Sequence, residues 1–348
     1  MSRLARRAGV SVLLALLTGC AGQPTPSTLA TPASAGTTSP TVPSVETAIP
    51  APTDTSPEDR DWLLYGRFVG DSVKAGYIAD RNGRVEHRIL SQVDGDIRSL
   101  GWTTDNHISF VVRDAVHPDG AIWTARYGGE GAVLYYDGRR DGCDSVFHPD
   151  WSPDGTRVSM VCYRPEGSAL AVLDVATREL RLLETYVWPE VLDNPARWSR
   201  DSTTLAYDVL HWDPTNSFVD GSRIATIAAD GSARPTYLDA FESNAARPAW
   251  NLDGTTLIYN TYDLSSVHSD VASDIFTMRP DGTNVEAVLT AADAGVARLA
   301  QPVWDTIGGS QVWATALTDA GLRIVSIDAE TWHVTVLPIE GSEVEPRR

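Results

Sequence analysis

The stretch FHPDWSPDGTRVSMV, residues 147–161, combines a Trp, a Ser-Pro-Asp-Gly turn and a run that alternates like a strand. Related stretches surround Trp102, Trp198, Trp250 and Trp304, so that a Trp recurs about every 50 residues. In each stretch a polar turn follows the Trp, and an alternating apolar run follows the turn, which predicts a β-hairpin. A repeat of this length is typical of the blades of a β-propeller.

A second motif, which consists of two short apolar strands separated by a turn with Gly, Asp or Thr, follows each of the five Trp hairpins, and one further copy precedes the first of them. Its six copies lie at residues 76–90, 121–135, 170–183, 224–238, 275–289 and 324–337. The two motifs together supply four strands per repeat. We therefore predict an all-β fold, a six-bladed β-propeller of four-stranded blades, preceded by a disordered tether.

The repeat resembles the PD40 repeat of TolB-like β-propellers, whose signature is P-x-W-S-P-D-G followed by an I-Y-x-x-D-x-D-G hairpin. Residues 151–155 are a full copy, residues 250–254 are close to one, and the resemblance covers roughly residues 60–338. On this interpretation the repeated Trp side chains pack between blades and the Asp-Gly turns reverse the chain. The alternative role of a Trp is a stacking platform for sugar, and among the Trps outside the repeat position we predict Trp212 to be the most exposed.

The first blade has no Trp ahead of its turn, where Ser56-Pro57-Glu58-Asp59 stands. Its innermost strand must come either from the end of the preceding linker or from the tail EGSEVEPRR, residues 340–348. The sequence leaves both sources open.

The N-terminal stretch MSRLARRAGVSVLLALLTGC has the three parts of an export signal. Arg3, Arg6 and Arg7 form a positive region, and residues 10–17 form an apolar region too short to span a bilayer. The final Leu-Thr-Gly-Cys resembles the lipobox of bacterial lipoproteins, which implies cleavage before Cys20 and diacylglycerol on its thiol. Two acyl chains anchor a protein stably, whereas one is marginal. An ordinary secretory signal with an incidental Cys is the alternative.

Residues 21–57 are rich in Pro, Thr, Ser and Ala and nearly free of charge, so they cannot bury a core and are expected to be disordered. As polyproline II they would extend ~115 Å at most, which suits a spacer. An O-glycosylated stalk has the same composition. The predicted organisation is a signal peptide (1–19), a lipidated Cys with its linker (20–57), the propeller (58–340) and a C-terminal tail (341–348).

The formal net charge of −18, from 28 Lys and Arg against 46 Asp and Glu, makes the chain acidic, with a pI near 4.7. Phosphate would be repelled, which argues against nucleic acid or an anionic membrane surface as a partner of the folded part. A solvated acidic surface is the simplest interpretation, and cations or basic partners come second.

Three predicted loops, each between the second and third strand of its blade, carry one His with nearby carboxylates. They contain His117 with Asp114 and Asp119, His211 and Trp212 with Asp208 and Asp213, and His268 with Asp263, Asp270 and Asp274. Such loops share one face around the channel of a propeller, so they could hold a divalent cation with His and carboxylate or all-oxygen ligands. Local ligand spacing such as H-E-x-x-H is absent, which favours ordinary polar loop residues and no cofactor.

Cys143 and Cys162 flank the predicted hairpin of the third blade. In an exported protein a disulfide between them is favoured. Two separate buried thiols are the alternative, because a one-residue change of register would place them on opposite faces of the sheet.

The sequence contains no G-x-S-x-G elbow, no phosphate-binding Gly loop and a single Lys, Lys74. We therefore expect a non-enzymatic lipoprotein of the extracytoplasmic face of the cell membrane, whose propeller binds an envelope protein, a peptide or a glycan. The TolB resemblance implies such a docking role, although this chain has a tether in place of TolB's N-terminal α/β domain. The alternative is a metal-dependent polysaccharide lyase or hydrolase with its site in the channel. This function is known for oligogalacturonate lyases with similar propellers, and it predicts that His117, His211 and His268 converge.

Overall fold

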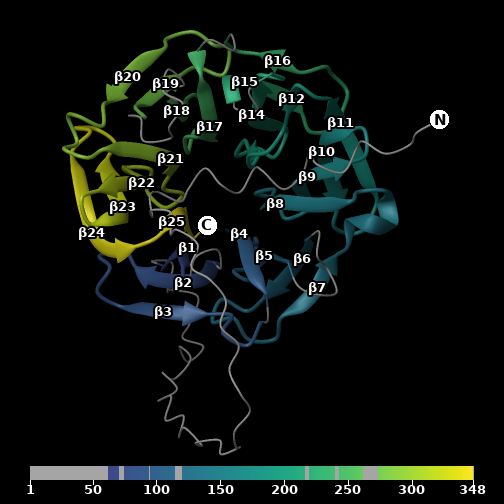
Figure 1. The fold of residues 1–348 in the computed structure, drawn as a ribbon, viewed down its shortest axis with the longest axis horizontal. Coiled ribbons are helices and arrows are strands. Elements are labelled where there is room, and N and C mark those ends of the chain that lie inside the picture. The colour runs from purple at the N-terminus through teal and green to yellow at the C-terminus, as the bar shows by residue number, and fades with distance from the viewer. Residues whose placement is uncertain are drawn as a thin grey trace, which may run out of the picture. The chain divides into compact units, whose positions relative to one another are not determined.

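The computed structural model describes residues 62–69, 74–93, 95–113, 120–215, 219–239, 243–261 and 273–347. They form six antiparallel sheets around a central axis, and the predicted six-bladed β-propeller is confirmed (Figure 1). Among these residues no helix is long and apolar enough to cross a membrane.

The first three blades each contain four strands, named in order from the axis outward. Blade 1 contains β25 (Ser342–Pro346), β1 (Trp62–Phe68), β2 (Lys74–Asp80) and β3 (Glu86–Ile89). Blade 2 contains β4 (Asp96–Trp102), β5 (Ile108–Arg113), β6 (Ala121–Ala125) and β7 (Val133–Tyr136). Blade 3 contains β8 (Ser145–Trp151), β9 (Arg157–Arg164), β10 (Gly167–Asp174) and β11 (Leu180–Tyr186). A 3-10 turn, η2 (Gly138–Asp141), precedes β8.

Blade 4 differs because its inner edge is divided between two short strands. These are β12 (Glu190–Val191) and β13 (Arg197–Trp198), and both pair with β14 (Thr204–Trp212), which is followed by β15 (Val219–Ala228) and β16 (Thr236–Tyr237). Blade 5 contains β17 (Ala245–Trp250), β18 (Leu257–Thr261), β19 (Ile275–Met278) and β20 (Glu286–Leu289). Blade 6 contains β21 (Arg298–Trp304), β22 (Gln311–Thr318), β23 (Gly321–Asp328) and β24 (Val334–Glu340).

The C-terminal strand closes the ring. β25 runs antiparallel to β1 with Leu63 opposite Pro346, and the backbone N–H of Arg347 donates to the carbonyl of Trp62 at 3.1 Å. Of the two sources left open by the sequence, the tail therefore supplies the innermost strand of blade 1. The propeller boundary drawn at residue 340 moves accordingly to include Ser342–Pro346.

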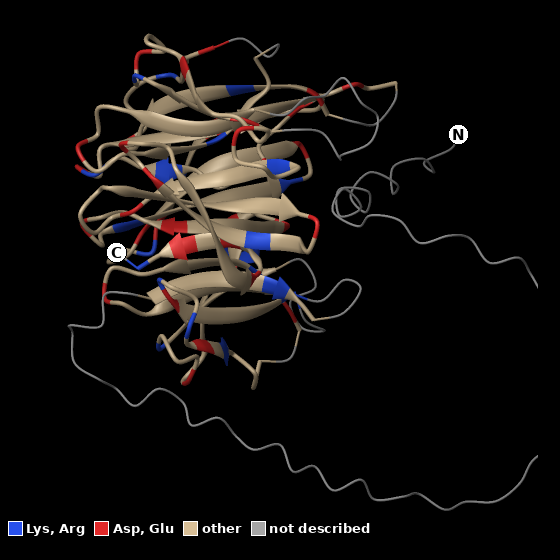
Figure 2. Cartoon of the chain, turned by 90° about the vertical axis from the view of Figure 1, so that its left-hand side faces the viewer, with Lys and Arg blue, Asp and Glu red and all other residues tan. Residues whose placement is uncertain are grey.

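The two faces of the ring carry different connections. The turn face carries the turns between the first and second strands, and the two ends of the described chain, Trp62 and Arg347, meet there. The loop face carries the connections between second and third strands and those between successive blades. Acidic and basic residues are both spread over the body of the propeller (Figure 2).

The repeated Trp side chains join neighbouring blades. Trp198 of blade 4 donates from Nε1 to the carbonyl of Asp150 in blade 3 at 2.9 Å, and Trp250 of blade 5 donates likewise to Arg197 in blade 4 at 3.0 Å. Trp198 is 6% exposed. Trp198 and Trp250 thus place large apolar rings between sheets while their indole nitrogens are hydrogen-bonded, as expected of structural residues.

The Ser-Pro-Asp-Gly turn is fixed by its own side chains. Asp154 accepts hydrogen bonds from the Oγ of Ser152 at 2.6 Å and from the backbone N–H of Thr156 at 3.0 Å. Gly155 has a φ of 72°, in the left-handed region that favours glycine. The same contact recurs after Trp198, where the Oγ of Ser199 donates to Asp201 at 2.6 Å although the following Gly is replaced by Ser202.

A bulge in the innermost strands shapes the channel. The residue three positions before the Trp position has a positive φ in five blades: Ser99, His148, Arg247, Gln301 and Glu343. The strand register shifts at each of these positions. Positive φ is uncommon for residues other than glycine, so its recurrence at the same position of five blades makes the bulge a regular element of this propeller.

Candidate functional site

Strand register places a row of polar side chains on one side of blade 4. Glu190 of β12 lies opposite His211 of β14, and His211 lies opposite Gly221 of β15. Residues directly opposite one another project to the same side of a sheet, and Arg223, two positions after Gly221, projects there too. Tyr237 of β16 lies opposite Ala225 and continues the row.

These side chains pair with one another. The Nδ1 of His211 is 2.5 Å from the Oδ1 of Asp220, and a guanidinium nitrogen of Arg223 is 3.3 Å from the Oε2 of Glu190. The Arg223 guanidinium also lies 3.6 Å from the ring centroid of Tyr237, a cation–π contact. Each of these four side chains, His211, Asp220, Arg223 and Glu190, is 20 to 36% exposed, so the groups are oriented and still reachable from solvent.

An exposed Trp lies on the connection that leads into the same end of blade 4. Trp188, in the connection from β11 to β12, is 54% exposed, and its neighbour Val187 is 57% exposed. The ring of Trp188 packs on Trp212 with centroids 5.8 Å apart and planes tilted by 35°. The backbone N–H of Trp212 donates to the carbonyl of Pro189 at 3.0 Å, which ties the connection to the end of β14. We call Trp188, Glu190, His211, Asp220 and Arg223 the junction site, because they lie where blades 3 and 4 meet on the loop face.

Among the predicted loop residues, His211, Asp208, Asp213 and Asp274 lie in the part of the chain that the structure describes, and each has a different partner. His211 bonds Asp220, whereas Asp208 points to the opposite side of its strand, where it accepts a hydrogen bond from the amide of Asn194 at 2.8 Å. Asp213 caps its own loop by accepting from the backbone N–H of Thr215 at 2.6 Å. Asp274 bonds the backbone of Ala291. The remaining predicted residues, Asp114, His117, Asp119, Asp263, His268 and Asp270, lie outside the described residues.

The prediction that Trp212 is the most exposed of the Trps outside the repeat is wrong. Trp212 is 3% exposed because it belongs to the end of β14 and is covered by Trp188. Within the described ranges, no group of three or more His, Cys, Asp or Glu side chains is placed to hold a metal ion.

The channel holds a second group of charged residues. A cavity of about 50 Å³ is lined by bulge residues that include His148, Arg247 and Glu343. Lys74 bonds Glu343 at 2.7 Å. Burial alone would raise the pKa of the Glu343 carboxyl, but the Lys74 ammonium outweighs it and holds the pKa at about 2.

An ion pair crosses the channel between opposite blades. Arg197 of blade 4 forms two hydrogen bonds with the carboxylate of Glu345 on β25, in blade 1. Arg197 also lies 3.6 Å from Asp150 of blade 3. Both side chains of the pair are less than one-fifth exposed. The charged side chains here are bound mainly to each other.

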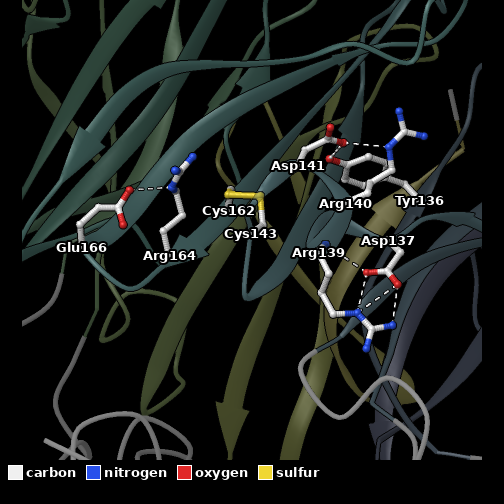
Figure 3. The surroundings of a disulfide bond; sticks show 9 residues. All are labelled: Tyr136, Asp137, Arg139, Arg140, Asp141, Cys143, Cys162, Arg164 and Glu166. Carbon is white, nitrogen blue, oxygen red and sulfur yellow. Dashed lines mark hydrogen bonds and ion pairs between the residues drawn. A yellow bond between two sulfur atoms is a disulfide. The ribbon is translucent and has the colours of Figure 1, made fainter.

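The two predicted cysteines form a disulfide between the connection before β8 and the strand β9 (Figure 3). Their Cα atoms are 5.4 Å apart, and both side chains are buried in blade 3. The bridge lies outside the junction site and the channel lining.

No sequence pattern singled out Trp188, Glu190, Arg223 or Tyr237. The stretch VWPE, residues 187–190, could have indicated an exposed aromatic residue, because an apolar pair followed by Pro is unusual in a connection that is expected to be polar. The roles of Arg223 and Tyr237 follow from strand register, which the sequence did not resolve.

No protein-family model and no curated protein sequence matches the chain. Among solved structures, TolB from Acinetobacter baumannii matches with a TM-score of 0.61 at 16% identity, covering 82% of this chain and 65% of that one, so this chain spans less than two thirds of that protein. A putative TolB from Agrobacterium tumefaciens matches at 0.57 and 15%, covering 79% and 87%. An oligogalacturonate lyase in complex with manganese matches at 0.52 and 16%, covering 79% and 72%. The propeller fold is therefore TolB-like.

Proposed function

We propose that this chain is a lipid-anchored protein of the extracytoplasmic face of the cell membrane, whose propeller binds a protein, peptide or glycan without catalysing a reaction. The observation that carries the proposal is the junction site, in which the loop-face end of blade 4 carries a half-exposed Trp188, the Arg223–Glu190 ion pair and the contact between His211 and Asp220. Exposed aromatic residues flanked by charged hydrogen-bonding groups are typical of binding surfaces.

The geometry of the chain ends supports this arrangement. Trp62, where the described chain begins, lies on the turn face beside Arg347. A tether that joins the propeller ahead of Trp62 therefore attaches on the side opposite the junction site. A ligand on the loop face would meet no obstruction from the point of attachment.

The anchor is tested by replacing the predicted lipidated residue. Cys20→Ala should remove labelled fatty acid from the protein and shift it from the membrane fraction to the soluble fraction. A variant that keeps both its label and its membrane fractionation would contradict lipidation at Cys20.

Binding is tested by capture with the purified full-length chain. Trp188→Ala should lose a captured ligand that the wild type retains. The matched control is Val133→Ala, which removes a side chain that is 58% exposed on the outer strand β7, away from the junction site. Equal capture by wild type and Trp188→Ala would contradict binding at this surface.

The likeness to a manganese-bound lyase supplies the alternative of a metal-dependent enzyme acting on polysaccharide. Metal content by mass spectrometry, on protein purified without a His tag, and thermal melting with and without EDTA separate the two functions. We expect no stoichiometric metal and no shift in Tm. A stoichiometric metal with a melt lowered by chelator would overturn the non-enzymatic proposal.

A further inference from the structure

We propose that a groove between blades 2 and 3, on the turn face, binds the arginine side chain of a basic peptide segment. A cavity of about 690 Å³ lies in this groove, and its walls include Asp105 and His107 of blade 2 and Trp151 and Gly155 of blade 3. The inference goes beyond the proposed function, because the turns that line the groove lie on the face opposite the junction site.

The next junction along the chain, between blades 3 and 4, holds an arginine of the protein itself. The guanidinium carbon of Arg157 in blade 3 lies 5.0 Å from the ring centroid of Trp198 in blade 4. Arg157 also donates to the backbone carbonyl of Ser202 at 2.6 Å. Ser202 follows Trp198 by four residues. The arginine thus binds the next blade through a Trp ring and an oxygen of the turn after it.

The junction between blades 1 and 2 uses an arginine in the same way. The guanidinium carbon of Arg347, at the end of blade 1, lies 5.7 Å from the ring centroid of Trp102 in blade 2. Its Nε donates to the Oδ1 of Asn106 at 3.2 Å, and Asn106 again follows the Trp by four residues. Two arginines from different parts of the chain therefore make the same pair of contacts.

The groove between blades 2 and 3 has the corresponding residues but a histidine in place of the arginine. His107 and Arg157 each directly precede the residue that pairs with the Trp of their own blade, so they occupy equivalent positions. Gly155, four residues after Trp151, stands at the position of Ser202. Because His107 is shorter than an arginine, we infer that the place of the guanidinium is left to a ligand.

The aromatic wall of the groove already contacts one guanidinium. The rings of Tyr135 and Trp151 are 5.0 Å apart and tilted by 57°, and both residues line the cavity. The guanidinium carbon of Arg178 lies 4.1 Å from the centroid of Tyr135, a cation–π contact. Trp151 is 6% exposed, so a bound arginine would contact only the part of its ring that lines the cavity, together with Tyr135.

Two carboxylates in the cavity wall favour a cation. The side chain of Asp105 is 72% exposed, and Glu130 is exposed as well. Arg126 also lines the cavity and supplies one opposing charge. A planar guanidinium binds carboxylates through paired hydrogen bonds, whereas a lysine ammonium acts as a point charge. The net charge of −18 attracts basic segments at a distance.

The test measures binding of three peptides to the full-length protein by calorimetry. The peptides are acetyl-Gly-Gly-Arg-Gly-Gly-amide and the same sequence with lysine or with citrulline, which has nearly the shape of arginine without its charge. We expect the arginine peptide to bind several-fold more tightly than the lysine peptide and the citrulline peptide not to bind. Glu130→Gln should weaken binding of the arginine peptide several-fold.

His107→Arg is the variant that distinguishes a filled groove from an open one. It should place a guanidinium where Arg157 has one at the next junction, raise Tm, and weaken binding of the arginine peptide about ten-fold or more. His107→Gln leaves the groove open and should bind as the wild type does. Thr204→Arg is the matched control, because it adds the same charge at the equivalent position of blade 4, directly before the residue that pairs with Trp198.

Each other result would overturn the inference. Equal binding of the arginine and lysine peptides would contradict recognition of a guanidinium. Unchanged binding in His107→Arg, or equal weakening in Thr204→Arg, would show that the groove is not the site. Loss of binding in Trp188→Ala would place the peptide at the junction site. No binding of any peptide would reject the inference and leave the proposed function, which concerns the opposite face, unaffected.

Discussion

His148 and Asp193 are partly buried side chains, and the shifts of their pKa values have opposite effects on stability. Burial lowers the pKa of the His148 imidazole to about 4, and Arg247 and Arg197 act in the same direction. Burial raises the pKa of the Asp193 carboxyl to about 6, although Tyr163 donates to it. Each group is therefore held neutral over a range in which it would be charged in the unfolded chain.

The two groups give stability slopes of opposite sign between about pH 4 and 6. In the unfolded chain His148 binds a proton that the folded state lacks. Its contribution to the free energy of unfolding therefore falls as the pH falls from 6.5 to about 4. Folded Asp193 holds a proton that the unfolded carboxyl has released, so its contribution falls as the pH rises from about 4 to about 6. We expect the slopes to offset each other in the wild type.

Replacing one of the two side chains should leave the pH dependence of the free energy of unfolding set by the other. Asp193→Asn should make the free energy of unfolding rise with pH across this window, by about 2–3 kcal/mol, and His148→Gln should make it fall by a similar amount. Urea unfolding at pH 4, 5, 6 and 7 measures both. Identical pH profiles for the two variants would contradict the assignment.

Arg197 has two carboxylate partners, so we expect its replacement to cost more stability than the replacement of one partner. Arg197→Met leaves both Glu345 and Asp150 without their guanidinium and should lower the free energy of unfolding by about 3–5 kcal/mol. Glu345→Gln should cost less, because Arg197 retains Asp150 at 3.6 Å. Urea midpoints at pH 7 compare the variants, and equal costs would argue against the shared role of Arg197.

Exposure of individual residues was the least predictable feature. Trp212 follows a predicted strand and precedes polar loop residues, which suggested exposure, yet Trp188 from another blade connection covers it. Contacts of this kind join residues that are distant along the chain, and no local pattern encodes them. The conformation of the Asp154 turn, by contrast, follows from Ser152 and Thr156 beside it.

At the scale of elements, the hairpins could be predicted because their turns and alternation are local. The bulges could not, because a positive φ at His148 or Gln301 is supported by other elements. The backbone N–H of Gln301 in blade 6, for example, donates to Asn260 of blade 5 at 3.1 Å. Buried polar side chains of one blade thus support the bulge of the next.

The disulfide of blade 3 should contribute measurably to stability. It closes a loop with a sequence separation of 19, for which chain entropy predicts about 3 kcal/mol. Cys143→Ala with Cys162→Ala should lower the free energy of unfolding by about that amount. Reductant should destabilise the wild type similarly and leave the double variant unchanged, and a response of the double variant would contradict the explanation.

At the scale of the whole molecule, closure depends on one short strand. β25 supplies the backbone partner of β1 and the carboxylates for Lys74 and Arg197. Deleting residues 342–348 should abolish cooperative thermal unfolding or lower Tm by more than about 10 °C, because the lost strand exposes an edge, removes the carboxylate bound to Lys74 and leaves Arg197 with Asp150 alone. A synthetic peptide of residues 340–348 should restore Tm, whereas a scrambled peptide should not. A truncated chain that melts as the wild type does would contradict this role.

The whole ring could be predicted from the repeat, but the site could not. A sequence repeat shows the features that all blades have in common, whereas a binding surface depends on features that one blade does not share with the others. Blade 4 departs through its divided inner edge and the connection that carries Trp188. The His residues that the sequence emphasised fall on predicted loops, where local patterns constrain position least.

The hydrogen bond between Arg347 and Trp62 has a consequence for the order of the blades along the chain. Because the last strand and the first are neighbours, a short peptide could join them and the chain could be opened in a different connection. Such a circular permutant would begin in another blade, and blade 1 would then be one continuous segment. The blades would keep their order around the ring and only the point at which the chain begins would change, so new ends could be placed on the loop face or the turn face.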